Sequence, residues 1–405
     1  MSQTEVQLIK ADAVQTGDIA NSAVTDAKIA GLTSSKLTGA LPAISGAALT
    51  NLPPSGKASN LVINGDMRVA VRATSSTSNG YQTLDRYKIE SSNITHNSTK
   101  SRQDLSSSDT GPWEAGFRNY ARIALAQAGV VAANSGVEIQ QRIEAQNIAS
   151  SGWNYGSASS NLTLQFWFRC STNQTFYGYL YTFDGTPQVY TFSFTASANN
   201  TWTKITKTIP GNSNLTFNND TGPGLQLKLI AFYGTDYTNN KTLDQWAAFD
   251  NANQMPDMAS TWLTAGASTF DVTGIQLEVG DTPTDFEHKT FNDELITCQR
   301  YLQILKHGGF SQGVVGTNQE AVRMGVSLIT AMRTEPSVSV TGTINTYDGS
   351  DIRYYTAAIP YVNSNQAFDW DSDTTGASGS QMTAGRGCVA YSHSSSGGFI
   401  ISAEL

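Results

Sequence analysis

The sequence predicts a mainly β protein with a thin extended N-terminal segment, a jelly-roll β-sandwich and a smaller C-terminal β-sandwich. Three observations predict this fold class. Many short runs alternate between apolar and polar side chains with a period of two, as half-buried strands do. Clusters of Asn, Gly, Asp and Pro separate these runs. The first 57 residues contain no aromatic residue at all. We therefore divide the chain into residues 1–57, 58–290 and 291–405.

In the N-terminal segment, large aliphatic residues recur every five positions, which fits neither a helix nor a strand. So few aliphatic side chains cannot form a core within one chain, but several copies wound around one axis can each contribute a residue per layer. The alternatives are a coil of pentapeptide repeats, for which the array is short, and a disordered linker. We favour an intertwined stalk, with oligomerisation contacts at Ile9, Val14, Ile19, Val24 and Ile29.

The central segment carries the clearest strand pattern. Gln226 and Lys228 are expected on the solvated face of their strand. The stretches 114–128 and 137–145 are ambiguous between helix and strand, and we interpret both as strands. Many short strands with such turns predict an antiparallel sandwich or jelly roll. The other strands are expected over residues 162–170, 175–183, 189–194, 202–209, 225–232 and 270–279.

The C-terminal segment, residues 291–405, is long enough for one small β domain. Apolar residues alternate over 322–328, at Val338 and Val340, and from Phe399 to the end of the chain. The runs 376–380 and 393–398 are rich in Gly and Ser and predict loops.

Composition and charge exclude several classes of function. Charged residues make up 14% of the chain and the net charge is −8. A nucleic-acid-binding protein needs a basic stripe, and a peripheral membrane protein needs a polybasic patch, so we expect neither role. No apolar stretch is long enough for a transmembrane helix. The N-terminus lacks the basic and apolar regions of a signal peptide, which predicts synthesis in a cytoplasm. The odd number of distant cysteines, Cys170, Cys298 and Cys388, predicts buried free thiols.

Few motifs for catalysis occur in the sequence. The Gly-x-Ser-x-Gly spacing of a nucleophile elbow is matched at residues 309–313, but no His-Glu-x-x-His pair and no phosphate-binding loop occurs. Glycoside cleavage needs only two converging carboxylates, so it stays open as an alternative. The one local acid cluster is Asp369, Asp371 and Asp373. Alternate carboxylates ligate Ca²⁺ in an EF-hand loop, but Thr374 and Ser380 replace the required Gly and Glu. We interpret the cluster as a solvated acidic turn, with a Ca²⁺ site as the alternative and no other cofactor expected.

Aromatic residues among polar ones are candidates for glycan binding, because aromatic faces stack on sugar rings. Tyr177, Tyr179 and Tyr181 share one face of a strand. That face is either part of a sandwich core or subunit contact, which we favour, or an exposed sugar platform. The candidates in the C-terminal segment are Tyr347, Tyr354, Tyr355, Tyr361 and Trp370.

Short motifs in the chain occur in a particular order. In that order they resemble bacteriophage tail fibre proteins that contain a carbohydrate-binding-like jelly-roll module. The N-terminal pentads are similar to the tail-attachment and shaft region of such fibres. The motifs are residues 60–67 (NLVINGDM), 83–87 (TLDRY), 140–144 (QQRIE), 274–280 (GIQLEVG), 283–288 (PTDFEH), 293–301 (DELITCQRY) and 402–405 (SAEL).

The resemblance implies a homotrimeric fibre on the tail of the virion, made in the host cytoplasm. It would dock on a tail or baseplate protein and bind host surface polysaccharide as an adhesin rather than an enzyme. The alternatives are a glycan-cleaving tailspike and a baseplate or shaft component without a receptor role. We expect attachment in residues 1–57 and host recognition in residues 291–405, where Tyr and Trp stand in long loops.

Overall fold

The computed structural model describes residues 60–96, 98–306, 308–317, 322–356, 358–362, 364–372, 377–392 and 397–405. The predicted stalk, with Ile9, Val14, Ile19, Val24 and Ile29, lies outside the described residues. The structure divides the chain between Ser55 and Gly56. Within the described ranges, no helix has both the length and the apolar character needed to cross a membrane. The mainly β architecture that the sequence predicts is confirmed.

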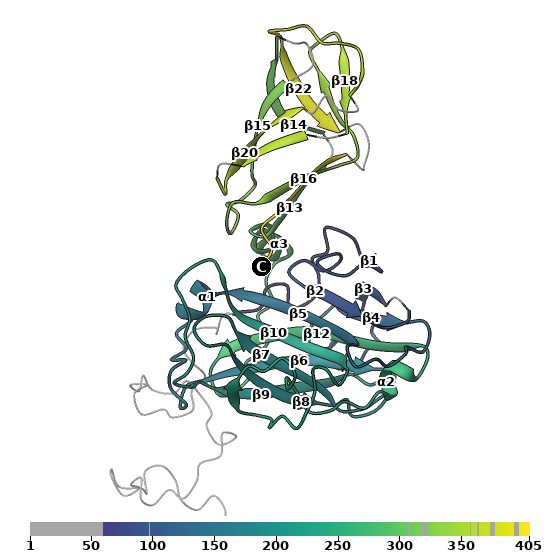
Figure 1. Cartoon of the computed structure of the whole chain (residues 1–405), viewed down its shortest axis with the longest axis vertical. Helices are drawn as coiled ribbons and strands as arrows, with labels where there is room; N and C mark the ends of the chain where they lie inside the picture. Colours follow the sequence, from purple (N-terminus) through teal and green to yellow (C-terminus); the bar gives the residue numbers. More distant parts are fainter. Residues whose placement is uncertain are drawn as a thin grey trace, which may run out of the picture. The chain divides into compact units, whose positions relative to one another are not determined.

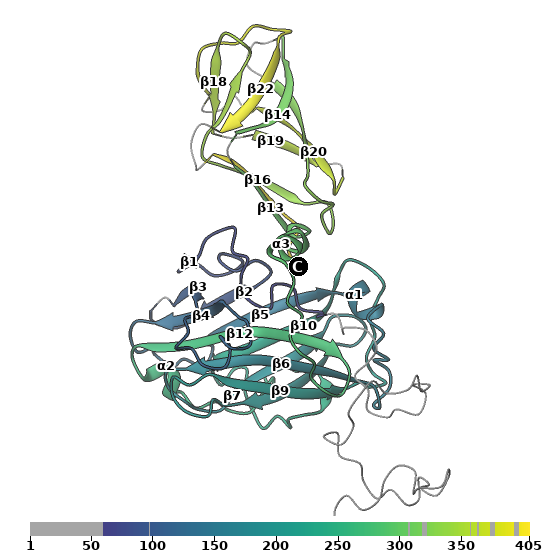
Figure 2. The same cartoon turned by 180° about the vertical axis from the view of Figure 1, so that it is seen from behind.

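Two antiparallel sheets form the central sandwich (Figure 1). In spatial order sheet A contains β1 (Ser75–Ser76), β3 (Thr99–Asp104), β4 (Asn119–Leu125), β12 (Ser268–Val279), β6 (Asn161–Cys170) and β9 (Thr203–Pro210). In the reverse view of Figure 2, β12 lies between β4 and β6. Sheet B contains β11 (Trp246–Ala248), β8 (Gln188–Phe194), β7 (Phe176–Thr182), β10 (Pro223–Tyr233), β5 (Gly136–Glu144) and β2 (Lys88–Ser92).

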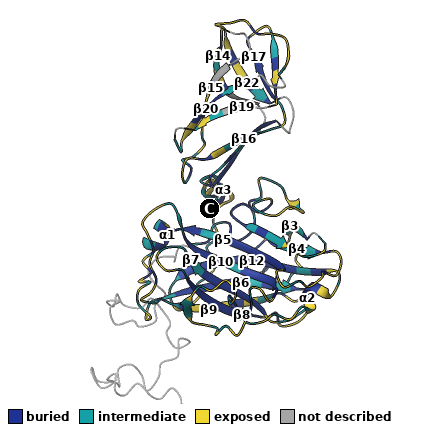
Figure 3. Cartoon of the chain, in the orientation of Figure 1, coloured by how far each residue is buried: buried dark blue, intermediate teal, exposed yellow. Residues whose placement is uncertain are grey.

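The main core lies between the two sheets and follows the alternation in the sequence. In β6, Leu164, Phe166 and Phe168 are buried in this core, whereas Trp167 belongs to a separate aromatic cluster. Phe168 meets Phe176 of sheet B edge to face, with ring centroids 5.2 Å apart. Figure 3 shows the buried residues concentrated along β5, β10, β12 and β6. The two ambiguous stretches contain strands β4 and β5, as interpreted from the sequence.

Short helices interrupt the strands. They are α1 (Ala145–Ala149), α2 (Thr261–Thr264) and α3 (Phe291–Gln299). The α3 helix begins where Thr290 accepts a hydrogen bond from the backbone N–H of Asp293, at 3.2 Å. A hydroxyl N-cap and two acidic residues in the first turn both favour a helix start here. The residues that resemble the start of a C-terminal module are therefore helical.

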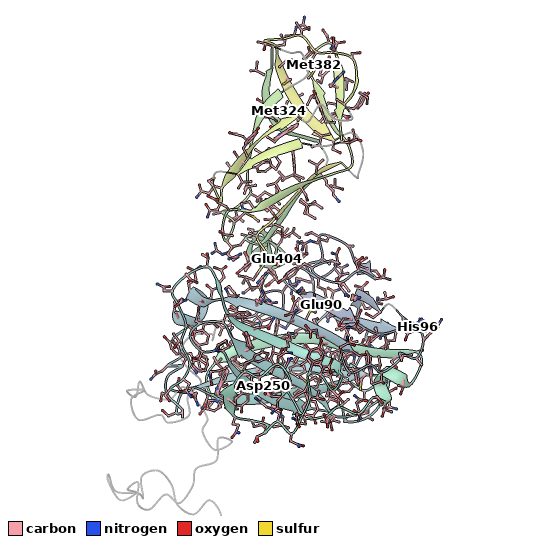
Figure 4. The ribbon with its side chains drawn as sticks, in the orientation of Figure 1. Glu90, His96, Asp250, Met324, Met382 and Glu404 are labelled. Carbon is pink, nitrogen blue, oxygen red and sulfur yellow. The ribbon has the colours of Figure 1, made fainter. Side chains whose placement is uncertain are left out.

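Residues after α3 form two further sheets around a second core. The labels in Figure 4 place Met324 and Met382 among these strands, and both are buried. In the described residues the smaller sheet contains β13 (Leu302–Lys306), β23 (Gly398–Ser402) and β16 (Ser337–Thr341). The larger sheet contains β19 (Ala358–Val362), β20 (Ala367–Ser372), β15 (Val322–Ser327), β14 (Gly308–Val315), β22 (Gly387–Ser392), β17 (Ile344–Tyr347), β18 (Ile352–Tyr355) and β21 (Ser378–Gly379).

The motifs behind the family resemblance bind one another in a buried junction. Glu144 accepts hydrogen bonds from Nε and Nη2 of Arg300, both at 2.8 Å, and from the hydroxyl of Tyr301. Arg86 pairs with Glu404 and lies over the ring of Tyr301, 3.5 Å from its centroid. These five side chains therefore serve the architecture, because they contact one another across distant chain segments.

The buried carboxyl of Asp85 in this junction should make the free energy of unfolding depend on pH. Its carboxyl is buried, and Oδ2 has no hydrogen-bond partner in the described part of the chain. Burial raises the pKa of Asp85 to about 6. An unfolded Asp titrates near 4, so the folded state holds the proton more tightly. The stabilisation linked to this proton is present below pH 4 and is lost as the pH rises through about 6.

Between pH 4 and pH 6.5, Asp85 should lower the free energy of unfolding of the wild type by about 2–3 kcal/mol. We expect Asp85→Asn to abolish this part of the pH dependence. Urea unfolding across this range measures the change. Asp236→Asn is the matched control, because Asp236 is exposed. Equal pH slopes for wild type and Asp85→Asn would contradict the prediction.

Candidate functional site

The outer face of sheet B carries a row pattern of aromatic and polar side chains. Because side chains alternate along a strand, every second residue of β7, β10 and β5 points away from the main core. The antiparallel register aligns them across the three strands in three rows. The rows are Tyr181, Gln226 and Arg142; then Tyr179, Lys228 and Gln140; then Tyr177, Ile230 and Glu138.

Aromatic rings form one wall beside these rows. The ring of Tyr181 meets Phe183 and Phe249 edge to face, with centroids 4.9 Å and 4.8 Å away. In a second pair, the ring centroids of Tyr233 and Tyr237 lie 5.1 Å apart. Tyr181, Phe183 and Phe249 are each half-buried, so parts of their rings stay open to solvent.

A polar network forms the floor. The Lys228 ammonium lies 2.7 Å from Oε1 of Glu138 and donates to the hydroxyl of Tyr233 at 3.0 Å. Gln226 donates to Gln140, which in turn donates to Glu138 at 3.2 Å. These bonds leave each glutamine amide further donor and acceptor capacity.

Burial and pairing shift the titration of the floor residues. Burial raises the pKa of Tyr179 to about 12, so its hydroxyl is protonated at neutral pH. Burial also raises the pKa of Glu138, although the neighbouring Lys228 opposes this. For Lys228, burial alone would lower the pKa, but Tyr179 and Glu138 beside it raise the pKa above its ordinary value. The ammonium therefore stays charged and fixed in place.

Wall and floor enclose a groove of about 380 Å³, which we call the sheet B groove. A small-molecule site of this kind measures about 300–1,000 Å³, so the groove can take one or a few sugar rings. Its lining residues are Glu90, Ser92, Gly136, Glu138, Arg142, Tyr179, Tyr181, Phe183, Gln226, Lys228, Tyr233, Tyr237, Phe249, Asn251 and Gln254.

The predicted tyrosine face lies on the groove side of the sheet. These residues point away from the main core and pack in a separate cluster with Val189 and Ile230, so the expected place in the sandwich core is corrected, whereas the expected subunit contact stays a prediction. Tyr179 and Tyr181 line the groove, but Tyr177 is buried beside it. The hydroxyl of Tyr179 donates to Oε1 of Gln254 at 3.1 Å, and this hydrogen bond links the floor to another lining residue of the groove.

The predicted C-terminal residues fall into two groups. Tyr347, Tyr354 and Tyr361 are each 39% exposed, so their rings are accessible. Tyr355 and Trp370 are 0% exposed, and their selection as glycan contacts is corrected: a ring without surface cannot stack on a sugar. Both alternate inward on their strands, and the ring of Trp370 packs on Phe399 at 5.4 Å between centroids.

The predicted acid cluster is only partly described. Asp369 and Asp371 lie two residues apart in β20, whereas Asp373 lies outside the described residues. Among the residues that the structure does describe, no group of three metal-ligating side chains occurs. All three cysteines are buried free thiols, as predicted.

Several groove residues were not recognised as site residues from the sequence. Gln226 and Lys228 were expected on a solvated face, and Arg142 was noted only within a family motif. Glu138, Tyr233, Tyr237, Phe249 and Gln254 were missed. The only available signal was the strand pattern of residues 136–144 and 223–233, which keeps polar residues on one face. This pattern marks an outward face but does not reveal a groove.

Comparisons with known proteins find only weak similarity, and only to solved structures. No protein-family model and no curated protein matches the sequence. The enzymatically active domain of bacteriophage CBA120 tailspike protein 4 is similar over 55% of this chain and 21% of its own, with 9% identity and a TM-score of 0.29.

Carbohydrate-binding modules are similar over about the same share of the chain. The family 11 module of a Clostridium thermocellum cellulosomal cellulase aligns over 51% of this chain and 95% of its own, with 10% identity and a TM-score of 0.25. The N-terminal cellulose-binding domain of Cellulomonas fimi β-1,4-glucanase C aligns over 53% and 97%, with 9% identity and a TM-score of 0.25. At TM-scores this low, these similarities carry no conclusion about this chain.

Proposed function

We propose that this chain is a phage tail fibre adhesin that binds host surface polysaccharide in the sheet B groove. The observation that carries the proposal is the combination in one groove of an aromatic wall around Tyr181 and a floor of amides and fixed charges. The apolar face of a sugar ring stacks on aromatic rings, and its hydroxyls need hydrogen-bonding partners when they leave water. The groove offers both within one site.

Residues 1–57 would serve assembly and attachment in such a fibre. The pentad array of residues 1–57 would hold three chains together and fix them to a tail or baseplate protein. Three equal weak sites on one fibre raise the overall avidity through effective concentration, so no single contact needs to be tight. Light scattering on the full-length chain tests this part, and a monomer at micromolar concentration would contradict it.

Replacing Tyr181 by Ala tests the groove directly. We expect the affinity per site to fall about 10-fold or more, because buried aromatic contacts dominate interface energies. An array of bacterial surface polysaccharides identifies a binding polysaccharide, and calorimetry then measures the affinity. Tyr354→Ala is the control, since this tyrosine is exposed on β18. If Tyr354→Ala abolished binding and Tyr181→Ala did not, recognition would belong to the C-terminal module.

A second candidate function is cleavage of the polysaccharide. Glu138 and Glu90 lie directly opposite each other on β5 and β2, and both line the groove. Two carboxylates are what glycoside hydrolysis requires, and a raised pKa suits a general acid. We propose binding without cleavage because Glu138 and Glu90 are each paired with a lysine, Lys228 and Lys88.

Incubation of the bound polysaccharide with the protein separates the candidates. Retention without shorter chains supports the adhesin, and shortened chains that Glu138→Gln prevents would support a tailspike enzyme. Absence of any binding would favour a structural component of the shaft or baseplate.

A further inference from the structure

We propose that the sheet B groove selects an acidic glycan, and that Arg142 pairs with the carboxylate of one of its sugars. This inference rests on the proposed function and adds the class of polysaccharide that the groove accepts.

Two carboxylates and two cations line the groove, but they are not all paired with one another. Of the four charged side chains there, Glu138 is paired with Lys228 at 2.7 Å, and Glu90 is paired with Lys88 at 2.8 Å. Arg142 is left, and in the described part of the chain no carboxylate is paired with its guanidinium. When Lys88 beside the groove is counted, three cations stand against two carboxylates, and Arg142 is the cation without a carboxylate partner in a protein whose net charge is −8.

Arg142 is also partly desolvated. Its Nε is enclosed and has no hydrogen-bond partner among the described residues. The guanidinium carbon lies 5.0 Å from the ring centroid of Phe183, a cation–π contact that limits its orientations. The enclosed Nε is out of a ligand's reach, but the Arg142 side chain as a whole is only half-buried, so an anionic ligand can pair with the accessible part of the guanidinium. The site is thus prepared for an acceptor that the described chain does not supply.

The register positions Arg142 opposite the aromatic wall. Gln226 lies between Tyr181 and Arg142 on the neighbouring strands, so the two outer residues are two strand spacings, about 10 Å, apart. A sugar ring over Gln226 would have an aromatic ring on one side and the guanidinium on the other. A carboxylate on that ring would then meet Arg142.

A carboxylated sugar fits Arg142 better than a neutral one. Arginine presents a planar fork of N–H donors that matches a carboxylate in a bidentate pair. Neutral hydroxyls would also accept hydrogen bonds but would leave the charge unpaired. The negative net charge of the whole chain would repel a polyanion elsewhere, so recognition depends on this local site.

The experiment uses the full chain and an array of bacterial surface polysaccharides, each printed in its native form and with its carboxyl groups chemically reduced to alcohols. We expect binding to uronate-containing polysaccharides and loss of that binding after reduction. Arg142→Gln should weaken binding to the native polymer about 10- to 100-fold, and Arg142→Lys should weaken it less. Arg118→Gln is the matched control, because it removes the same charge from an exposed arginine that does not line the groove.

Each contrary outcome has a separate meaning. Binding to a neutral polysaccharide that Arg142→Gln leaves unchanged would overturn the acidic-glycan inference and keep the proposed function. Loss on carboxyl reduction without an effect of Arg142→Gln would place the carboxylate elsewhere and overturn the role of Arg142. Binding only to phosphate-bearing polymers would overturn the carboxylate assignment. No binding to any polysaccharide would contradict the proposed function itself. Equal thermal melting of wild type and Arg142→Gln shows that the variant is folded.

Discussion

Glu144→Gln is expected to lower the free energy of unfolding by about 3 kcal/mol at pH 7. The carboxylate of Glu144 is 0% exposed and accepts hydrogen bonds from Arg300, from Tyr301 and, at 2.6 Å, from Gln146. Glutamine keeps the volume but leaves the guanidinium without its anion. The Arg300 side chain is 33% exposed, which lets water recover part of the loss.

The pH dependence of this contribution has a definite sign. Burial would raise the pKa of Glu144, but the hydrogen bonds from Arg300 and Tyr301 outweigh burial and lower it. The stabilisation is therefore present above the unfolded pKa and is lost as the pH falls through the lower folded value.

Urea unfolding of Glu144→Gln and Glu90→Gln provides the test. Glu90 is the control because its pair with Lys88 is more exposed, with side-chain exposures of 35% and 30%, and such pairs contribute less than about 1 kcal/mol. Equal destabilisation by the two variants would show that the junction does not depend on the buried carboxylate.

Trp370→Ala is expected to destabilise the C-terminal module by about 3–5 kcal/mol. Trp370 is 0% exposed and packs in the second core with Phe399, so its removal leaves a cavity that neighbouring side chains fill only in part. Trp370→Phe should cost less, because it keeps an aromatic ring and removes an indole N–H that has no acceptor among the described residues.

The tyrosine at position 354 is the control for Trp370. It is exposed, so Tyr354→Ala should change stability by only about 0.5 kcal/mol. Chemical denaturation followed by limited proteolysis measures both variants. A folded, stable Trp370→Ala variant that had lost only polysaccharide binding would mean that the indole contacts the ligand after all.

The strand pattern of the central sandwich could be predicted because alternation is a local property. Residues 162–170 alternate except at Trp167, and Leu162, Leu164, Phe166 and Phe168 lie in the main core. The stretch 137–145 was harder, since most of β5 is buried on both faces. Its outward face carries Glu138 and Gln140 under the groove network, so the polar side chains are buried by their partners rather than by the core.

The candidate site was predicted only in part. Tyr179 and Tyr181 were selected from the sequence, but the groove also needs Arg142, Gln254 and Phe249, which come from distant segments. No local pattern links these residues, because strand pairing and loop closure bring them together. For the same reason, Trp370 and Tyr354 look alike in sequence, and only packing separates the core ring from the exposed one.

By itself, the sequence determined that residues 175–183 contain a strand with three tyrosines on one side, since a period of two specifies faces without reference to the rest of the chain. It could not determine which face covers the core. Phe176 and Leu180 on the other side are equally apolar, and a strand inside a sandwich can bury both faces. The tertiary structure decided this by packing sheet A against Phe176 and Leu180, which left Tyr179 and Tyr181 to line the groove.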